Sequence, residues 1–190
     1  MFDWLLNIDH LIFTFLNGLH LDWMDPIQYW ISNKYIWIPL YALLLVGIIY
    51  QYKKKAIIII LLMVGLITAS DQTARVFKYK VGRQRPSSTL SSLGYTPHSV
   101  NGYKGKGNAS FYSAHASNSF AIAIFIGTLL IPVIRNAKTY LLFWAALVAY
   151  SRVYLGVHFP SDITIGAITG IIYGWLFLKF FKFTIQIFKY

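Results

Sequence analysis

The residues best suited to chemistry lie in three short polar stretches, each beside a long apolar run. One stretch runs from Ser151 to Asp162 and contains Arg152 and His158. A histidine can act as a nucleophile or carry a proton near neutral pH, and an aspartate four residues later can hold its far nitrogen and fix the tautomer. Arginine is a permanent cation whose planar fork matches phosphate oxygens. Charged side chains are rare at membrane depth, so this combination predicts a functional site.

The other two stretches supply groups of matching chemistry, which are Lys78, Arg85, Ser113, Ala114 and His115. The cations, together with Arg152, match the charge of a phosphate, and arginine can bind it through two bonds at once. Ser113 and the neighbouring amides are expected at a helix start, where N–H donors and the helix dipole favour an anion. One histidine could attack phosphorus while the second protonates the departing alkoxide. Such a transfer requires mainly positioning and charge stabilisation.

Neither a metal centre nor a cofactor is expected at these stretches. The carboxylates are few, and the surrounding cations would repel a divalent ion. The chain also contains no cysteine, which excludes a disulfide framework and a thiolate metal site.

The composition is that of a membrane protein. Of 190 residues, which we interpret as one domain spanning 1–190, 57% are hydrophobic and 12% are charged, against roughly 25% charged in soluble domains. The net charge of +11 would suggest nucleic acid for a soluble protein. Here the cations form short clusters between apolar runs, which fits membrane orientation and anionic lipids better. We therefore expect the bilayer, and no nucleic acid, as a partner.

Five apolar runs predict transmembrane helices, and they cover Pro26–Tyr50, Ala56–Ala74, Ser113–Ile134, Thr139–Val157 and Ser161–Phe181. Crossing a bilayer takes about 20 such residues. The predicted fold class is therefore all-α, an integral-membrane helical bundle. Gly166, Gly170 and Gly174 lie four residues apart on one face of the last run. This spacing predicts close approach of a neighbouring helix.

Two segments outside these runs receive separate interpretations. Residues 1–25 mix apolar and polar side chains, which predicts an amphipathic helix at the membrane interface with Trp4 and Trp23 as anchors. A sixth span over this segment is the alternative. Residues 75–112 form the longest polar connection, and such connections are usually functional or disordered. We interpret this one as a loop of the active site on the outer face.

Orientation follows from the basic clusters in short loops. Lys53–Lys55, Arg135 with Lys138, and the C-terminal lysines are separated by two spans each, and the positive-inside rule places them in the cytoplasm. The three polar stretches then share the opposite, outer face. The cations between Arg75 and Lys106 break the rule there, and binding an anion would explain them.

The combined pattern resembles one known family. Lys78-x6-Arg85-Pro86, Ser113-x-His115 and Ser151-Arg152-x5-His158-x3-Asp162 are similar to the motifs of the type 2 phosphatidic acid phosphatase (PAP2) family, which shares its site with vanadium haloperoxidases. The resemblance covers the chain from the second span to the fifth. It implies a helical bundle and hydrolysis without a metal.

The resemblance also implies a role for each matching residue. His158 would be the nucleophile that forms a phosphohistidine, Asp162 would orient it, and His115 would be the general acid. The phosphate would be held by Lys78, Arg85, Ser113, Ala114 and Arg152. Ala114 stands where the family usually has glycine, but its amide can still donate. Tyr112 stands where the family usually has proline.

The expected function is hydrolysis of a membrane lipid phosphate or diphosphate at the outer face. Candidate substrates are undecaprenyl diphosphate, phosphatidylglycerol phosphate, phosphatidic acid and the phosphates of lipid A. A lipid-to-lipid phosphotransferase would share the first half-reaction, and the sequence identifies neither lipid tail nor head. A channel or transporter with an anion site is the third alternative, and the lack of an inverted repeat argues against it. The small size and short loops suggest a bacterial inner-membrane enzyme that faces the periplasm and needs no obligate protein partner.

Several nearby polar residues receive non-catalytic interpretations. Lys80 and Arg83 are expected to face solvent or lipid headgroups, and Lys104 and Lys106 to lie in a flexible basic loop. No partner is apparent in the sequence for the remaining histidines, which are His10, His20 and His98.

Overall fold

The computed structural model is all-helical over the residues that it describes, which are 3–105 and 107–187. Its α-helices are α1 (Asp3–Gly18), α2 (Asp25–Ser32), α3 (Ile38–Tyr52), α4 (Ala56–Val81), α5 (Pro86–Thr89), α6 (Ala114–Leu129), α7 (Ala137–Tyr154) and α8 (Pro160–Ile187). Short 3-10 helices connect them, namely η1 (Lys34–Trp37), η2 (Lys53–Lys55), η3 (Ser91–Leu93) and η4 (Val100–Gly102). The predicted all-α fold class is confirmed.

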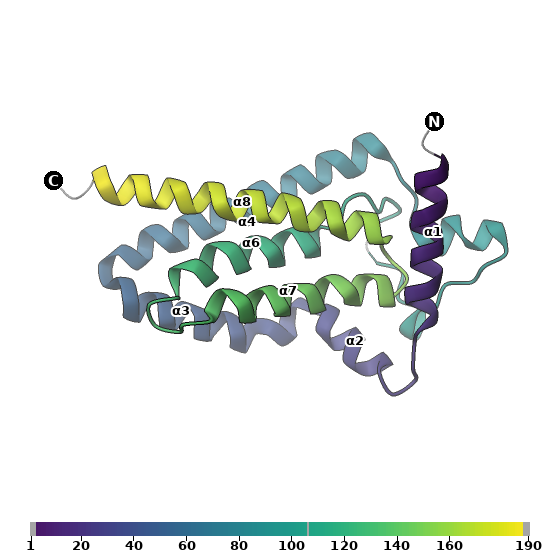
Figure 1. Cartoon of the computed structure of the whole chain (residues 1–190), viewed down its shortest axis with the longest axis horizontal. Coiled ribbons are helices and arrows are strands. Elements are labelled where there is room, and N and C mark those ends of the chain that lie inside the picture. Colours follow the sequence, from purple (N-terminus) through teal and green to yellow (C-terminus); the bar gives the residue numbers. More distant parts are fainter. Residues whose placement is uncertain (1–2, 106, 188–190) are drawn as a thin grey trace.

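The long helices α3, α4, α6, α7 and α8 run along the long axis of the molecule, and α1 crosses one end of them (Figure 1). Helix α6 lies at the centre, where it packs against α4, α7 and α8. Helix α3 pairs with α4. The structure is thus a helical bundle with one transverse helix at one end.

The surface of the bundle is typical of a protein surrounded by hydrocarbon. Large apolar side chains on the outer faces of the long helices are more than half exposed, among them Leu43, Val46, Leu61, Phe143 and Phe183. So many exposed large apolar side chains are rare on soluble proteins. Two stretches, Lys34–Val81 and Pro160–Gln186, are long and apolar enough to cross a membrane, and the first contains both α3 and α4. The count of five spans stays a prediction.

The helix boundaries differ from those predicted at several places; α6, for example, ends at Leu129 rather than Ile134, and α8 continues to Ile187 rather than Phe181. Two of the differences concern whole segments. The first predicted span, Pro26–Tyr50, is broken at Asn33, whose extended backbone separates α2 from η1 and whose side chain accepts a hydrogen bond from the Tyr35 N–H. The connection predicted over 75–112 begins later, because α4 continues to Val81. Residues 75–81 contain neither proline nor glycine, and Gly82 ends the helix in the left-handed conformation at φ +61°. Lys106 of this connection lies outside the described residues.

The three glycines of α8 bring it against α6, as their spacing predicted. A Cβ atom at Gly166, Gly170 or Gly174 would lie 2.6, 2.1 or 2.8 Å from the carbonyl oxygens of Ser113, Ser117 and Ala121, respectively. At the same end, the Ser113 N–H donates a hydrogen bond to the Asp162 carbonyl at 3.1 Å. The glycine contacts therefore fix the start of α6 relative to the start of α8.

Helix α1 is bound to the end of the bundle by a buried asparagine. The Asn17 side chain donates to the carbonyl oxygens of Val153 and Tyr154 at 3.1 and 2.9 Å, and accepts from the His98 N–H at 2.8 Å. Buried polar groups need such partners. The interfacial position of α1 stays a prediction, and Met1 and Phe2 of the predicted 1–25 segment lie outside the described residues.

Candidate active site

The three polar stretches meet at the end of the bundle that α1 crosses (Figure 1). This end is formed by the last turns of α4 and α7 and the first turns of α6 and α8. The positive charges of Arg152, Lys78 and Arg85 lie within electrostatic range of His115, as does the His158 side chain. The carboxylate of Asp162 in turn interacts electrostatically with Lys78 and Arg85. The structure therefore brings the predicted ionisable site residues into one electrostatic cluster.

His158 lies in a tight turn between α7 and α8. Gly156 adopts φ +70° there, and the N–H groups of Val157 and His158 both donate to the Arg152 carbonyl, at 3.1 and 3.2 Å. Pro160 then starts α8, where its fixed φ suits the first helical position. This turn brings His158 Nδ1 within 3.5 Å of Asp162 Oδ2 in the first turn of α8.

Asp162 and His158 face each other inside the protein. Asp162 Oδ2 lies 3.5 Å from His158 Nδ1, and the two side chains are 0% and 2% exposed. The same oxygen accepts the Phe159 N–H at 2.9 Å. Burial lowers the pKa of His158 to about 3, although Asp162 acts in the opposite direction. The imidazole is therefore neutral at pH 7, and Nε2 is the ring nitrogen that does not face Asp162.

Arg85 is fixed by backbone carbonyl groups. Its Nε donates to the Gly107 oxygen at 2.8 Å and its Nη1 to the Val157 oxygen at 2.7 Å. Gly105 packs directly on it, because a Cβ atom there would lie 3.0 Å from Arg85 Cζ. Burial, followed by the charge of Arg152, lowers the pKa of Arg85. Two buried guanidinium groups whose charges repel each other would be stabilised by a bound anion.

Arg152 is 2% exposed and meets residues from two other segments. Its Nη1 donates to the Ser32 hydroxyl and, at 3.2 Å, to the Tyr103 hydroxyl. The guanidinium also lies 5.4 Å from the centre of the Tyr103 ring. Ser32 and Tyr103 were not predicted, because neither motif nor spacing relates them to Arg152.

The start of α6 contributes Ser113, Ala114 and His115. The Ser113 side chain is the N-cap of the helix, where its Oγ accepts the Ala116 N–H at 3.4 Å. This is the helix start that was predicted, and a serine oxygen there satisfies a free amide. Ala114 and His115 occupy the first turn and line the cavity described below.

The interpretation of Arg83 as a solvent-facing residue is wrong. Its guanidinium donates to Ser161 Oγ at 2.7 Å, to Asp162 Oδ1 at 3.0 Å and to Asp9 Oδ2 at 2.6 Å. Its side chain is only 15% exposed. Asp9 lies 74 positions away in α1, and no local pattern in the sequence relates the two residues.

His98 also has a partner that the sequence did not indicate. Its Nε2 lies 2.9 Å from Asp25 Oδ1, and the Tyr154 hydroxyl donates to the same oxygen at 2.6 Å. The rings of His98 and His20 stack with centres 3.8 Å apart. These contacts join the connection between α4 and α6 to the start of α2 and the end of α7, next to the site.

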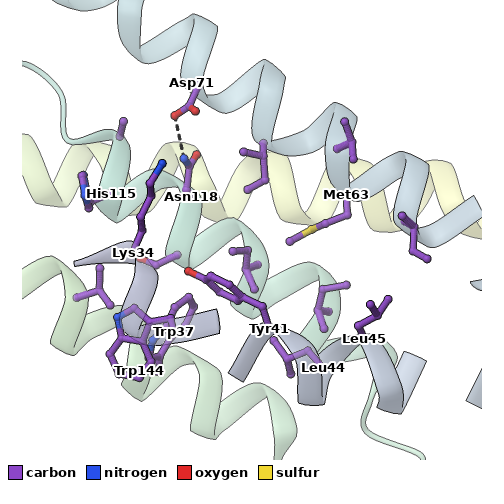
Figure 2. A pocket seen from close by; sticks show the side chains of 18 of the residues that line it. Lys34, Trp37, Tyr41, Leu44, Leu45, Met63, Asp71, His115, Asn118 and Trp144 are labelled. Atoms are coloured by element: carbon purple, nitrogen blue, oxygen red, sulfur yellow. Dashed lines mark hydrogen bonds between the residues drawn. The ribbon is translucent and has the colours of Figure 1, made fainter. Parts of the chain in front are cut away.

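A cavity of about 600 Å³ extends from the site between α3, α4 and α6. Figure 2 shows its two ends. His115, Lys34, Asp71 and Asn118 form a polar end, and apolar side chains such as Met63 line the remainder. Asn118 donates to Asp71 Oδ1 at 2.8 Å. The cavity therefore joins the cationic cluster to a largely apolar space within the bundle.

Comparison with known proteins gives consistent results. The PAP2 superfamily pattern matches residues 35–186. A lipid A 4'-phosphatase from Bacteroides thetaiotaomicron is 36% identical over 179 residues, which are 93% of this chain and 78% of that protein. A second lipid A 4'-phosphatase, from Porphyromonas gingivalis, is 29% identical over 185 residues, covering 95% and 76%.

A solved structure shares the fold. The crystal structure of a transmembrane PAP2 type phosphatidylglycerolphosphate phosphatase from Bacillus subtilis matches with a TM-score of 0.70. The match covers 93% of this chain and 85% of that one at 22% identity. At that identity, the likeness is one of fold.

Proposed function

This chain belongs to the PAP2 superfamily and is a membrane lipid phosphatase of that type, and we propose that it removes the 4'-phosphate of lipid A through a phosphohistidine. The observation that carries the mechanism is the His158–Asp162 pair beside Arg85 and Arg152. The cavity that begins at His115 supplies room for the part of the lipid next to the phosphate.

In the first step, Nε2 of His158 attacks phosphorus while Asp162 faces Nδ1. The bond between phosphorus and the lipid oxygen breaks, and His115 gives that oxygen a proton. Arg85, Arg152 and Lys78, with the amides at the start of α6, hold the phosphate oxygens. Fixed donors of this kind stabilise charge that develops in the transition state.

In the second step, water attacks the phosphohistidine. His115, now neutral, accepts a proton from the water, the phosphorus–nitrogen bond breaks, and inorganic phosphate leaves with His158 regenerated. A phosphotransferase would differ only in the acceptor. Since three side-chain cations already surround the phosphate, no step requires a metal, and activity should persist in EDTA.

The polar end of the cavity supports a substrate with a polar leaving group. Asn118 lies one helical turn after His115, the proposed acid, and is bonded to Asp71, with Lys34 lining the same end. A lipid A sugar offers hydroxyl and amide groups at this place, whereas a polyprenyl chain does not. The two similar lipid A 4'-phosphatases support the same choice.

We propose further that α3, α4, α6, α7 and α8 each cross the bacterial inner membrane. Lys53–Lys55, Arg135 and Lys138 lie at the turns opposite the site. The positive-inside rule then places the site at the periplasmic face, where α1 would lie along the membrane surface.

The test is a substrate panel in detergent micelles containing EDTA, with release of inorganic phosphate as the readout. Lipid A should give a higher kcat/KM than undecaprenyl diphosphate, phosphatidylglycerol phosphate or phosphatidic acid. Asn118→Leu should reduce the preference for lipid A without a matching loss on undecaprenyl diphosphate. Faster turnover of another lipid would refute the substrate assignment, and label passed to a second lipid without free phosphate would indicate a phosphotransferase.

A further inference from the structure

The carboxylate of Asp162 depends on residues outside the three polar stretches. It is 0% exposed, and its Oδ2 accepts the Phe159 N–H and faces His158 Nδ1 at 3.5 Å. Its other oxygen, Oδ1, accepts Arg83 Nη1 at 3.0 Å. An ionised carboxylate in such a place is costly unless it is paired and hydrogen-bonded. Arg83 provides that pairing.

Arg83 is itself held on its other side by the N-terminal helix. Its Nη2 donates to Asp9 Oδ2 at 2.6 Å, and the Asp9 side chain is only 9% exposed. The guanidinium also lies over Phe159, with Cζ 3.9 Å from the ring centre. The fork thus spans two carboxylates and an aromatic face, a geometry that lysine cannot reproduce.

Helix α1 makes further contacts with Phe159 and Ser161, which precede Asp162 in the chain. Asp9 Oδ1 accepts the Ser161 N–H at 2.9 Å. The rings of His10 and Phe13 pack on Phe159 with centres 5.0 and 5.4 Å away. Asp9 therefore fixes the backbone at Ser161, and His10 and Phe13 fix the Phe159 ring, next to Asp162.

We propose that Asp9 and Arg83 are positioning residues of the reaction, and that α1 is thereby part of the active site. Arg83 sets the direction of the Asp162 carboxylate, and Asp9 sets the direction of Arg83. This inference rests on the proposed role of Asp162 toward His158. One guanidinium shared by two carboxylates leaves Asp162 able to stabilise the positive charge that His158 gains when it is phosphorylated.

The arrangement separates Arg83 from the phosphate-holding cations. Its guanidinium is directed to Asp9, Ser161 and Asp162 rather than to the cavity. Loss of Arg83 should therefore lower kcat and leave KM nearly unchanged. A residue that holds phosphate in both ground and transition states would instead raise KM.

The experiment compares Arg83→Gln, Arg83→Lys and Asp9→Asn with Lys80→Gln, an exposed cation of the neighbouring turn. In full-length protein, kcat should fall about 10–100-fold in Arg83→Gln, the range known for outer partners that orient metal-ligating side chains. Arg83→Lys and Asp9→Asn should show smaller losses, with KM within about twofold throughout. Lys80→Gln should match wild type, and melting curves should verify that each variant is folded.

An Asp162→Asn variant separates this inference from the proposed function. Full activity in Asp162→Asn would refute the proposed mechanism itself. A severe loss in Asp162→Asn together with normal kcat in Arg83→Gln and Asp9→Asn would refute only the positioning role. A raised KM at unchanged kcat would make Arg83 a phosphate ligand instead. If Arg83→Gln does not fold, Asp9→Asn decides the result, and its kcat at the wild-type value would overturn the inference.

Discussion

Replacement of Gly170 by alanine should separate the two helices that position the site. The new Cβ atom would lie 2.1 Å from the Ser117 carbonyl oxygen, whereas ordinary contacts begin near 3.4 Å. The obstacle is helix backbone, which cannot rotate away as a side chain can. Helices α6 and α8 would have to move apart by about 1 Å, and overpacking of this kind costs about 1–3 kcal/mol.

The same movement should disturb catalysis. The Ser113 N–H to Asp162 carbonyl bond joins the two helix starts, so a shift there would change the distance between His115 and the His158–Asp162 pair. For a chain of this length, the stability loss corresponds to a melting temperature lower by roughly 2–12 °C. We expect kcat/KM on lipid to fall in parallel.

Gly65→Ala is the matched control. Gly65 also lies within a long helix, α4, but its Cβ would meet only the Phe177 ring at 3.4 Å, and alanine favours helix by about 1 kcal/mol over glycine. Thermal unfolding in detergent micelles and kcat/KM should be measured for both variants. If Gly170→Ala has the same melting temperature and kcat/KM as Gly65→Ala, the close packing of α6 on α8 is not what positions the site.

Three further predictions concern the charges and the topology. Arg152→Lys should lower kcat/KM about 10²–10³-fold, because an ammonium cannot replace the fork; a loss no greater than in Lys80→Ala would contradict this. Single cysteines at Lys54 and Lys104 should react with an impermeant thiol reagent in intact cells only at 104, and the reverse pattern would invert the orientation. His115→Ala should lose more activity on lipid phosphate than on p-nitrophenyl phosphate, whose leaving group needs less protonation. Equal losses on the two substrates would show that His115 is not the general acid.

Much of the architecture could be predicted from local patterns. Apolar runs and the glycines of α8 predicted helices and a close contact, because both depend on spacing within one segment. The meeting of Lys78, His115 and His158 at one end followed from the alternation of helix directions. These features need no knowledge of side-chain geometry.

The remaining features depend on contacts between distant residues. The Asp9–Arg83 pair arises because α1 folds across the bundle end, and its polar composition predicted only an amphipathic helix. The cavity beside His115 depends on how α3, α4 and α6 diverge, which their apolar sequences do not specify. The break at Asn33 was missed because a short polar interruption in an apolar run also occurs within continuous helices.

The phosphoenzyme is the most direct test of the mechanism. Wild-type protein and the His158→Ala and His115→Ala variants should be mixed with lipid carrying radiolabelled phosphate, quenched in alkali during turnover, and examined for label bound to protein. We predict acid-labile label in wild type and none in His158→Ala. Label that persists in His158→Ala and disappears in His115→Ala would show that His115 is the nucleophile, and the assignment of the two histidines would be wrong.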